Sequence, residues 1–276
     1  MPALYDSIGA GYGTTRRADP QITAALAHHL RIRADACFLD LACGTGNYTL
    51  ALAALGGRWQ ALDLSRQMLE QARSRGAMVA WLQADAAALP FAPQQFVGVV
   101  CTLAIHHFAR LEAPFAEVAR VLAGGPFVVF TAFADQMHGY WLGHYFPRMM
   151  ARSIAQMPTR TAVFGALHAA GFGVPQVVPF HVSHDLQDLF LYAGKHRPGL
   201  YLDAAVRANI SSFATLCPPD ELQAGLDALR ADIDSARFGD VAARYACALG
   251  DYAFVIARKP TPAGPEAFDR STVLGR

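Results

Sequence analysis

The chain has 276 residues, of which 53% are hydrophobic and 16% are charged, and its formal net charge is +1. This composition provides ample material for a buried core and excludes a largely disordered chain. The chain has no run of Lys or Arg and no long apolar window, so we expect neither a nucleic-acid partner nor a membrane span.

Alternating strands and helices are predicted over the first half of the chain. Asp19 and Pro20 precede an apolar periodicity and predict a capped helix. A glycine turn then leads to a helix near Tyr48, and a further helix opens at Ser65. Strands that are apolar throughout indicate a parallel sheet covered on both faces by helices. Five such strands are predicted, at 37–42, 59–64, 78–85, 96–103 and 126–133.

Two more strands are predicted in the second half, at 174–182 and 251–259, after a helical stretch from Asp135 to Gly171. The roughly sixty residues between them exceed ordinary loop lengths, so we expect a folded helical cap there. The predicted fold is α/β, a doubly wound and mostly parallel seven-stranded Rossmann-like sheet. Its predicted divisions are a lead-in at 1–20, a core at 21–184, the cap at 185–249, the last core strand at 250–259 and a loose tail at 260–276.

The stretch FLDLACGTGNYT, residues 38–49, places glycines where a strand turns sharply into a helix. Gly44 and Gly46 let the backbone approach a ligand at the carboxyl end of that strand. A dinucleotide-binding turn needs a third glycine, and Thr49 stands at its position. The motif alone leaves a nicotinamide-binding or phosphate-binding α/β fold open as an alternative.

Acidic residues lie at the ends of three successive predicted strands. These are Asp40, Asp63 and Asp85. Because the carboxyl ends of parallel strands meet at one edge of the sheet, the three carboxylates should line a single crevice. A nucleotide-binding fold with fortuitous glycines would leave this arrangement unexplained.

With these features the sequence resembles a class I S-adenosylmethionine-dependent methyltransferase, of the quinone C-methyltransferase-like (type 11) branch, over about residues 5–135. The resemblance implies S-adenosylmethionine as the cofactor, with Asp63 on the ribose hydroxyls and Asp85 on the adenine amino group. Asp40 either touches the cofactor, directly or through water, or only fixes the turn. The implied binding set in the core is Asp40, Ala42, Gly44, Gly46, Asp63, Leu64, Met68, Asp85, Ala86 and Thr102, with Leu64 and Met68 packed on adenine.

The lead-in YDSIGAGYGTTRRADP also resembles the start of this branch, where a Tyr and an Arg cover the cofactor. By that resemblance Tyr12 and either Arg16 or Arg17 hold the methionine carboxylate, because a guanidinium matches a carboxylate bidentately. We take Tyr12 and Arg17 as the candidates. A solvated loop before the first helix is the alternative.

Two adjacent histidines, His106 and His107, follow a segment that resembles the fourth strand of the family. Residues 102 to 107 would then lie beside the transferred methyl group, so either histidine is a candidate catalytic base. Alternatively, one of them holds the loop through a hydrogen bond to the backbone. Neighbouring side chains point apart, so at most one should face the acceptor. Adjacent histidines also rarely bind one ion together, and no metal is predicted.

An aromatic stripe after the fifth strand is the candidate acceptor wall. At helical spacing Tyr140, Trp141 and His144 share one face, with Tyr145 adjacent. Methyltransferases of this class build acceptor pockets there, and these side chains suit a flat, apolar substrate. Packing of the helix onto the core is the other interpretation.

The sequence therefore predicts a methyltransferase that acts on a small, aromatic or planar acceptor. A cyclase or another enzyme that borrowed the fold, and a sensor that binds the cofactor without turnover, remain alternatives. The chain is expected to be cytoplasmic, as a monomer or homodimer. It begins without a signal-peptide pattern, and its five cysteines lack the spacing of a disulfide framework.

Overall fold

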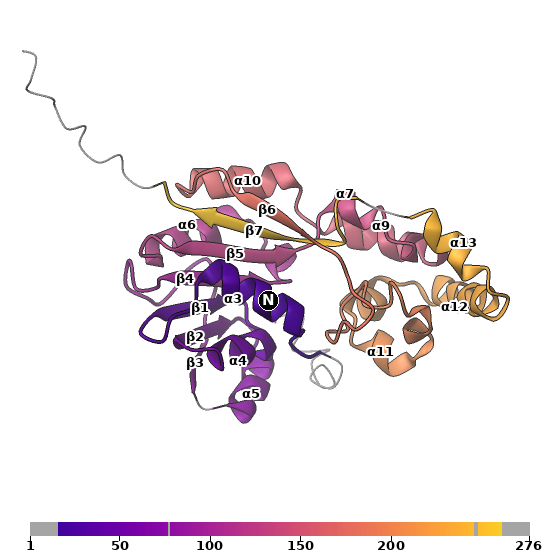
Figure 1. The fold of residues 1–276 in the computed structure, drawn as a ribbon, viewed down its shortest axis with the longest axis horizontal. Coiled ribbons are helices and arrows are strands. Elements are labelled where there is room, and N and C mark those ends of the chain that lie inside the picture. The colour runs from indigo at the N-terminus through magenta and orange to yellow at the C-terminus, as the bar shows by residue number, and fades with distance from the viewer. Residues whose placement is uncertain (1–15, 77, 246–247, 261–276) are drawn as a thin grey trace, which may run out of the picture.

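The computed structural model describes residues 16–76, 78–245 and 248–260, and its centre is a seven-stranded sheet (Figure 1). The strand order is β3-β2-β1-β4-β5-β7-β6. The first five strands run parallel, whereas β7 is antiparallel to both β5 and β6. The predicted α/β fold is confirmed. The strands are β1 (Cys37–Leu41), β2 (Arg58–Asp63), β3 (Val79–Gln83), β4 (Gly98–Thr102), β5 (Pro126–Thr131), β6 (Gln176–Phe180) and β7 (Tyr252–Arg258).

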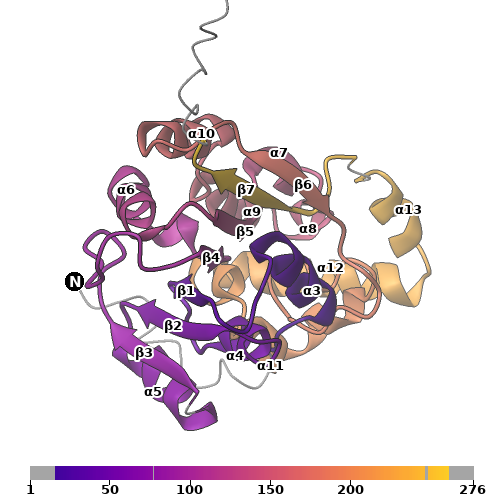
Figure 2. The same ribbon diagram turned by 60° about the vertical axis from the view of Figure 1, so that its left-hand side comes forward.

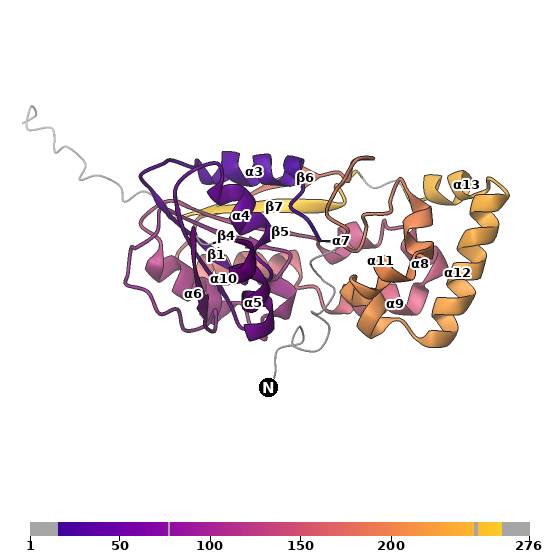
Figure 3. The same cartoon turned by 90° about the horizontal axis from the view of Figure 1, so that it is seen from below.

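Two hydrophobic clusters cover the two faces of the sheet. Phe38 and Val100 point into one cluster, while their neighbours Leu39 and Val99 point into the other, as the alternation of strand side chains requires. Helices α3 and α4 pack on the first face, and α6 and α10 pack on the second (Figures 2 and 3). Helix α5 packs on β2 and β3. These helices are α3 (Pro20–Leu30), α4 (Asn47–Ala53), α5 (Arg66–Arg75), α6 (Glu112–Val121) and α10 (Arg160–Ala169).

The predicted helix starts are confirmed at the two capping residues. The Asp19 carboxylate accepts hydrogen bonds from the backbone N–H groups of Gln21 and Ile22. The Ser65 hydroxyl accepts one from the backbone N–H of Met68. Each cap satisfies donors that the first turn of a helix leaves without an internal partner, which fixes where the chain leaves the preceding loop or strand.

A helical lobe stands beyond the carboxyl ends of the parallel strands (Figures 1 and 3). The predicted cap supplies only part of it, because the segment after β5 joins it. Gly225 of α12 sits against Phe146, where a Cβ atom would lie 2.4 Å from the ring, and the buried Glu221 accepts from the backbone N–H of Met149. The lobe consists of α8 (Leu142–Tyr145), α9 (Pro147–Ala155), η3 (Pro198–Leu202), α11 (Ala204–Ala208), η4 (Ser212–Leu216), α12 (Pro219–Asp234) and α13 (Phe238–Ala243).

Two expected helices differ in the structure. The stretch from Asp135 forms short α7 (Ala134–Met137) and α8, with a break around Gly139, rather than one continuous helix. Residues 185–194, which open the predicted helical cap, form turns and irregular segments instead of a helix. There Asp188 is buried in an ion pair, and Gly194 lies so close to Tyr201 that a Cβ atom would meet its ring at 2.3 Å. Tertiary contacts outweigh the weak helix preference of such a segment.

Candidate functional site

Two neighbouring cavities open at the carboxyl edge of the sheet. The larger has a volume of about 670 Å³ and the smaller about 80 Å³, and Arg16 and Leu103 line both. Ala42 and Leu103, which follow β1 and β4, have φ angles of 56° and 53°. Non-glycine residues in this left-handed region are strained and cluster at functional sites. Nine of the predicted cofactor residues line the larger cavity: Asp40, Ala42, Gly44, Asp63, Leu64, Met68, Asp85, Ala86 and Thr102.

Asp63 is held rigidly at the end of β2. Its carboxylate accepts hydrogen bonds from the backbone N–H groups of Gly44 and Ser65, each at 2.8 Å. These bonds join the glycine turn after β1 to the start of α5. Asp85 is fixed similarly after β3, where it accepts from the backbone N–H of Ala87 at 2.8 Å. Both carboxylates are oriented before any ligand binds, and carboxylate oxygens accept several hydrogen bonds each.

Asp40 is a buried acid with one satisfied oxygen. The Thr49 hydroxyl donates to its Oδ2 atom, whereas Oδ1 is buried and has no hydrogen-bond partner among the described residues. Burial raises the pKa of Asp40 to about 7, with a further rise from the Asp63 charge, and the Thr49 hydrogen bond opposes this shift. A cation bound next to Asp40 would therefore favour the carboxylate form and cause the carboxyl to lose its proton near neutral pH.

The two glycines of the turn have different roles. Gly44, at φ +55°, borders the larger cavity, and a Cβ atom there would meet nothing within 4 Å. Gly46, at φ +72°, does not line the cavity, and a Cβ atom there would meet the Trp81 ring at 2.3 Å. The predicted cofactor contact thus fits the position of Gly44, while Gly46 makes room for the packing of the turn on β3.

The lead-in brings Arg16 to the site. Arg17 is exposed and lines neither cavity, and Tyr12 lies outside the described residues. The Arg16 guanidinium pairs with Asp188 through two hydrogen bonds, of 2.5 and 3.1 Å, and the Tyr48 hydroxyl donates to the same carboxylate at 3.0 Å. The sequence contains no signal that separates Asp188 from the exposed acids of the cap.

The two histidines occupy a short 3₁₀ turn, η2 (Ile105–His107), directly after β4. His106 lines the smaller cavity and His107 lines the larger one, with ring centroids 4.0 Å apart. Burial lowers the pKa of His106 to about 3, with a smaller contribution from His107, and burial lowers the pKa of His107 to about 4. Both imidazoles are therefore neutral near pH 7.

The smaller cavity lies between the sheet edge and the lobe. The core contributes Thr131, Ala132 and Tyr252, and the lobe contributes side chains from α9 and η4. The Ser153 and Ser212 hydroxyls share a hydrogen bond of 2.9 Å. Apolar and polar side chains contribute to the walls in similar numbers, and small-molecule sites combine both kinds. The residues that line it are Arg16, Leu103, His106, Thr131, Ala132, Met137, Ser153, Gln156, Met157, Phe190, Leu191, Ile210, Ser211, Ser212 and Tyr252.

Comparison with known proteins identifies the family. The methyltransferase domain family matches residues 38–125, which contain the glycine turn and the three acids. The crystal structure of a putative methyltransferase from an antibiotic biosynthesis pathway of Anabaena variabilis is 32% identical in sequence. The match covers 88% of this chain and 98% of that one, with a TM-score of 0.79. The chain belongs to the class I S-adenosylmethionine-dependent methyltransferase family. The resemblance seen in the sequence is confirmed.

Curated relatives match part of the methyltransferase. A 2-phytyl-1,4-naphtoquinone methyltransferase of Thermosynechococcus vestitus is 33% identical over an alignment of 140 residues, and the match covers 45% of this chain and 60% of that protein. A malonyl-[acyl-carrier protein] O-methyltransferase of Erwinia pyrifoliae is 32% identical over 136 residues, or 49% of this chain and 52% of that protein. The chain thus spans about half the length of the curated relatives it matches.

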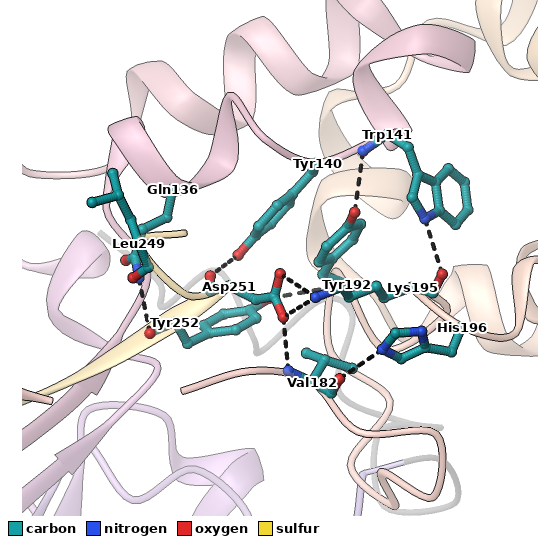
Figure 4. Close-up of polar contacts among 10 residues, drawn as sticks. All are labelled: Gln136, Tyr140, Trp141, Val182, Tyr192, Lys195, His196, Leu249, Asp251 and Tyr252. Atoms are coloured by element: carbon teal, nitrogen blue, oxygen red, sulfur yellow. Dashed lines mark hydrogen bonds and ion pairs between the residues drawn. The ribbon is translucent and has the colours of Figure 1, made fainter. Parts of the chain in front are cut away.

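The aromatic residues predicted as an acceptor wall line neither cavity of the methyltransferase. Tyr140 stacks on Tyr192 with ring centroids 3.8 Å apart and donates to the backbone carbonyl of Asp251 (Figure 4). The Trp141 indole donates to the backbone carbonyl of Lys195 at 3.1 Å. Tyr140 and Trp141 precede α8, which begins at Leu142, so they do not share a helical face with His144.

The other two predicted wall residues also lie elsewhere. Tyr145 is buried and donates to Asp232 at 3.0 Å, and His144 is exposed. Met137, which is four residues before Trp141, lines the smaller cavity instead. Most of the aromatic residues after β5 thus hold the lobe together.

Neither a metal-binding cluster nor a membrane-spanning helix is present in the described ranges. No group of three or more His, Cys, Asp or Glu residues within them is arranged to hold a metal ion. No helix within them combines the length and the apolar character needed to cross a bilayer.

Proposed function

We propose that this methyltransferase transfers a methyl group from S-adenosylmethionine in the larger cavity to a small, planar or aromatic molecule in the smaller cavity. The observation that carries the proposal is the arrangement of the two cavities. Oriented carboxylates from three successive strand ends line one of them, and His106 stands in the other, across a wall formed by Arg16 and Leu103. The cofactor supplies an activated methyl group that needs only positioning.

The residues of the larger cavity fit this cofactor. The oriented Asp63 carboxylate suits two ribose hydroxyls, and the side chain of Leu64, which is 54% exposed, offers an apolar surface for adenine. The unpartnered Oδ1 atom of Asp40 would hold the methionine ammonium group. Arg16 also lines this cavity, but its guanidinium is already paired with Asp188, so Arg16 forms part of the wall between the two cavities. The cavity volume of about 670 Å³ is also within the usual range for cofactor sites.

The residues of the smaller cavity would orient the acceptor and exclude water. Holding two reactants in the attack geometry supplies much of the rate acceleration of such a transfer. With its lowered pKa, His106 is a weak base that stays neutral and accepts a hydrogen bond from the acceptor. The buried Phe190 and Tyr252 rings provide flat apolar walls.

Calorimetry and product analysis test the proposal. Wild-type protein should bind S-adenosylmethionine and release S-adenosylhomocysteine when an acceptor is present. Asp63→Ala should weaken cofactor binding about 10- to 100-fold, because a hydrogen bond to a charged group contributes about 1.5–3 kcal/mol. Asp35→Ala, in which an 88%-exposed side chain is removed, is the matched control. Absence of cofactor binding, or equal affinity in the two variants, would refute the proposal.

A further inference from the structure

The smaller cavity limits the size of the acceptor. Its volume is about 80 Å³, whereas a cavity of about 150 Å³ is enough to bind benzene. A single ring therefore fits only with small movements of the partly buried wall residues Leu191 and Met157. A quinone with a long chain, or an acyl group on a carrier protein, is too large for this volume and would have to project out of the cavity.

The cavity also limits the charge of the acceptor. Among the residues that line it, Arg16 is the only charged one near neutral pH, and its guanidinium is already paired with Asp188. The Asp188 carboxylate already compensates that positive charge; its side chain is 1% exposed and also accepts from Tyr48. A carboxylate substrate would therefore gain little net attraction from Arg16 and would be repelled by the Asp188 charge.

His106 provides the polar recognition point. Its ring lines the cavity, and its Nδ1 atom is buried without a hydrogen-bond partner among the described residues. Because that nitrogen has no partner, nothing in this part of the chain fixes the tautomer, and the imidazole can present either a donor or an acceptor. A hydroxyl group can pair with either form of the imidazole, because it both donates and accepts hydrogen bonds. In the Ser153–Ser212 pair one proton is used in the mutual bond, so the pair offers a further polar contact.

From these three observations we infer that the smaller cavity selects a compact, uncharged, single-ring molecule with a hydroxyl group, such as a simple phenol, and that His106 recognises this hydroxyl. The inference rests on the proposed function for the statement that this cavity receives the acceptor. It assigns specificity to the cavity: the apolar part of the wall accommodates the ring, the small volume disfavours long chains, and Asp188 beside Arg16 disfavours carboxylates.

Calorimetry with matched ligands tests the inference, both with and without S-adenosylhomocysteine. The pair 4-methylphenol and p-xylene differs only by a methyl group in place of the hydroxyl. We expect 4-methylphenol to bind at least about tenfold more tightly, because a site built for a hydroxyl rejects the analogue without it. We also expect it to bind more tightly than 4-methylbenzoate and than a naphthol that carries a prenyl chain.

Three variants assign the preference to His106. His106→Phe should abolish the preference for 4-methylphenol over p-xylene, and His106→Asn, which keeps a hydrogen-bonding group, should retain part of it. His144→Phe, at an exposed position outside both cavities, should retain all of it. Thermal melting verifies that each variant is folded.

Several results would overturn the inference. Equal affinity for the two matched ligands, no binding of either, an unchanged preference in His106→Phe, or tighter binding of the benzoate or the prenylated naphthol would each do so. If S-adenosylhomocysteine fails to bind, the proposed function fails, while the comparison without it still tests the selectivity of the cavity. If turnover occurs only with the prenylated naphthol, the proposed function stands and this inference is wrong.

Discussion

The larger and smaller cavities are built in opposite ways. The larger is formed mainly by the turns that follow β1, β2, β3 and β4, so its walls are fixed by one sheet edge. The smaller joins side chains from the sheet edge and from residues 190–191 to side chains from α9 and η4 of the lobe. The first geometry is imposed by strand order, whereas the second depends on how the lobe packs. We therefore expect cofactor binding to survive changes in the lobe that alter acceptor binding.

The largest effect is expected from a substitution beside Arg16, which with Leu103 forms the wall between the two cavities. Asp188→Ala leaves the half-buried Arg16 without its partner and removes the acceptor of the Tyr48 hydrogen bond. Removing one member of a buried pair costs about 3–5 kcal/mol, and the lower figure fits Arg16, whose side chain is 13% exposed. Urea unfolding should show this loss, and calorimetry should show weaker binding of both cofactor and acceptor.

Asp234→Ala is the matched control for that experiment, since its side chain is exposed on the lobe. It should leave stability within about 0.5 kcal/mol of wild type. If Asp188→Ala weakened the binding of only one of the two ligands, Arg16 would contribute to one cavity alone. The two cavities would then not share a wall.

Glycine substitutions in the turn distinguish packing from ligand contact. Gly46→Ala introduces a Cβ atom 2.3 Å from the Trp81 ring at a left-handed φ, and we expect a loss of about 2–4 kcal/mol. Gly44→Ala has open space, so only the backbone strain of about 1–2 kcal/mol applies, but its methyl group projects where the cofactor is expected. Chemical unfolding and cofactor calorimetry should therefore rank the two variants in opposite orders. The same order in both measurements would contradict these roles.

The sequence was sufficient to predict the sheet and most of the larger cavity. Asp40, Asp63 and Asp85 were predicted to meet because strand ends of a parallel sheet share an edge, and this geometry follows from local patterns alone. The prediction for Tyr140 and Trp141 as an acceptor wall fails because both lie in the break between α7 and α8, where helical spacing does not apply. Such a break depends on tertiary contacts.

Apart from His106 and Arg16, the residues of the smaller cavity could not be predicted. Phe190 reaches it from the segment after β6, Ser212 from η4 and Tyr252 from β7, so no periodicity connects them. For His106 and His107, the sequence predicted that the rings would point apart. Which ring faces which cavity depends on the 3₁₀ turn, and no local pattern marks that turn.

The pH dependence of cofactor binding sharpens the description of the larger cavity. The pKa of Asp40 in the free protein is raised to about 7, so the carboxyl is largely protonated at pH 6. A cationic ligand favours the carboxylate, so binding should release a proton at pH 6, and affinity should increase up to about tenfold per pH unit until about pH 7. Calorimetry in buffers of different ionisation enthalpy measures the released proton.

Asp40→Asn removes the titrating group and should abolish this pH dependence. The stability of the ligand-free protein should respond as well. Because the folded-state pKa lies above the ordinary value, the unfolded chain loses its proton first, and wild-type stability should fall between about pH 4 and pH 7. The stability of Asp40→Asn should fall less over this pH range. An identical fall in the two proteins would contradict the raised pKa of Asp40.

A substitution in the lobe should have the smallest effect on ligand affinity. This effect should be confined to the smaller cavity. Met157→Ala shortens a partly buried side chain in the wall of that cavity and should increase its volume. We expect a prenylated naphthol to bind a few-fold more tightly, because one methylene group in an apolar pocket contributes about 1 kcal/mol or more. Affinity for S-adenosylhomocysteine should stay unchanged, since Met157 does not line the larger cavity. A parallel change in both affinities would mean that the lobe also shapes the larger cavity, and that the sheet edge alone does not determine cofactor binding.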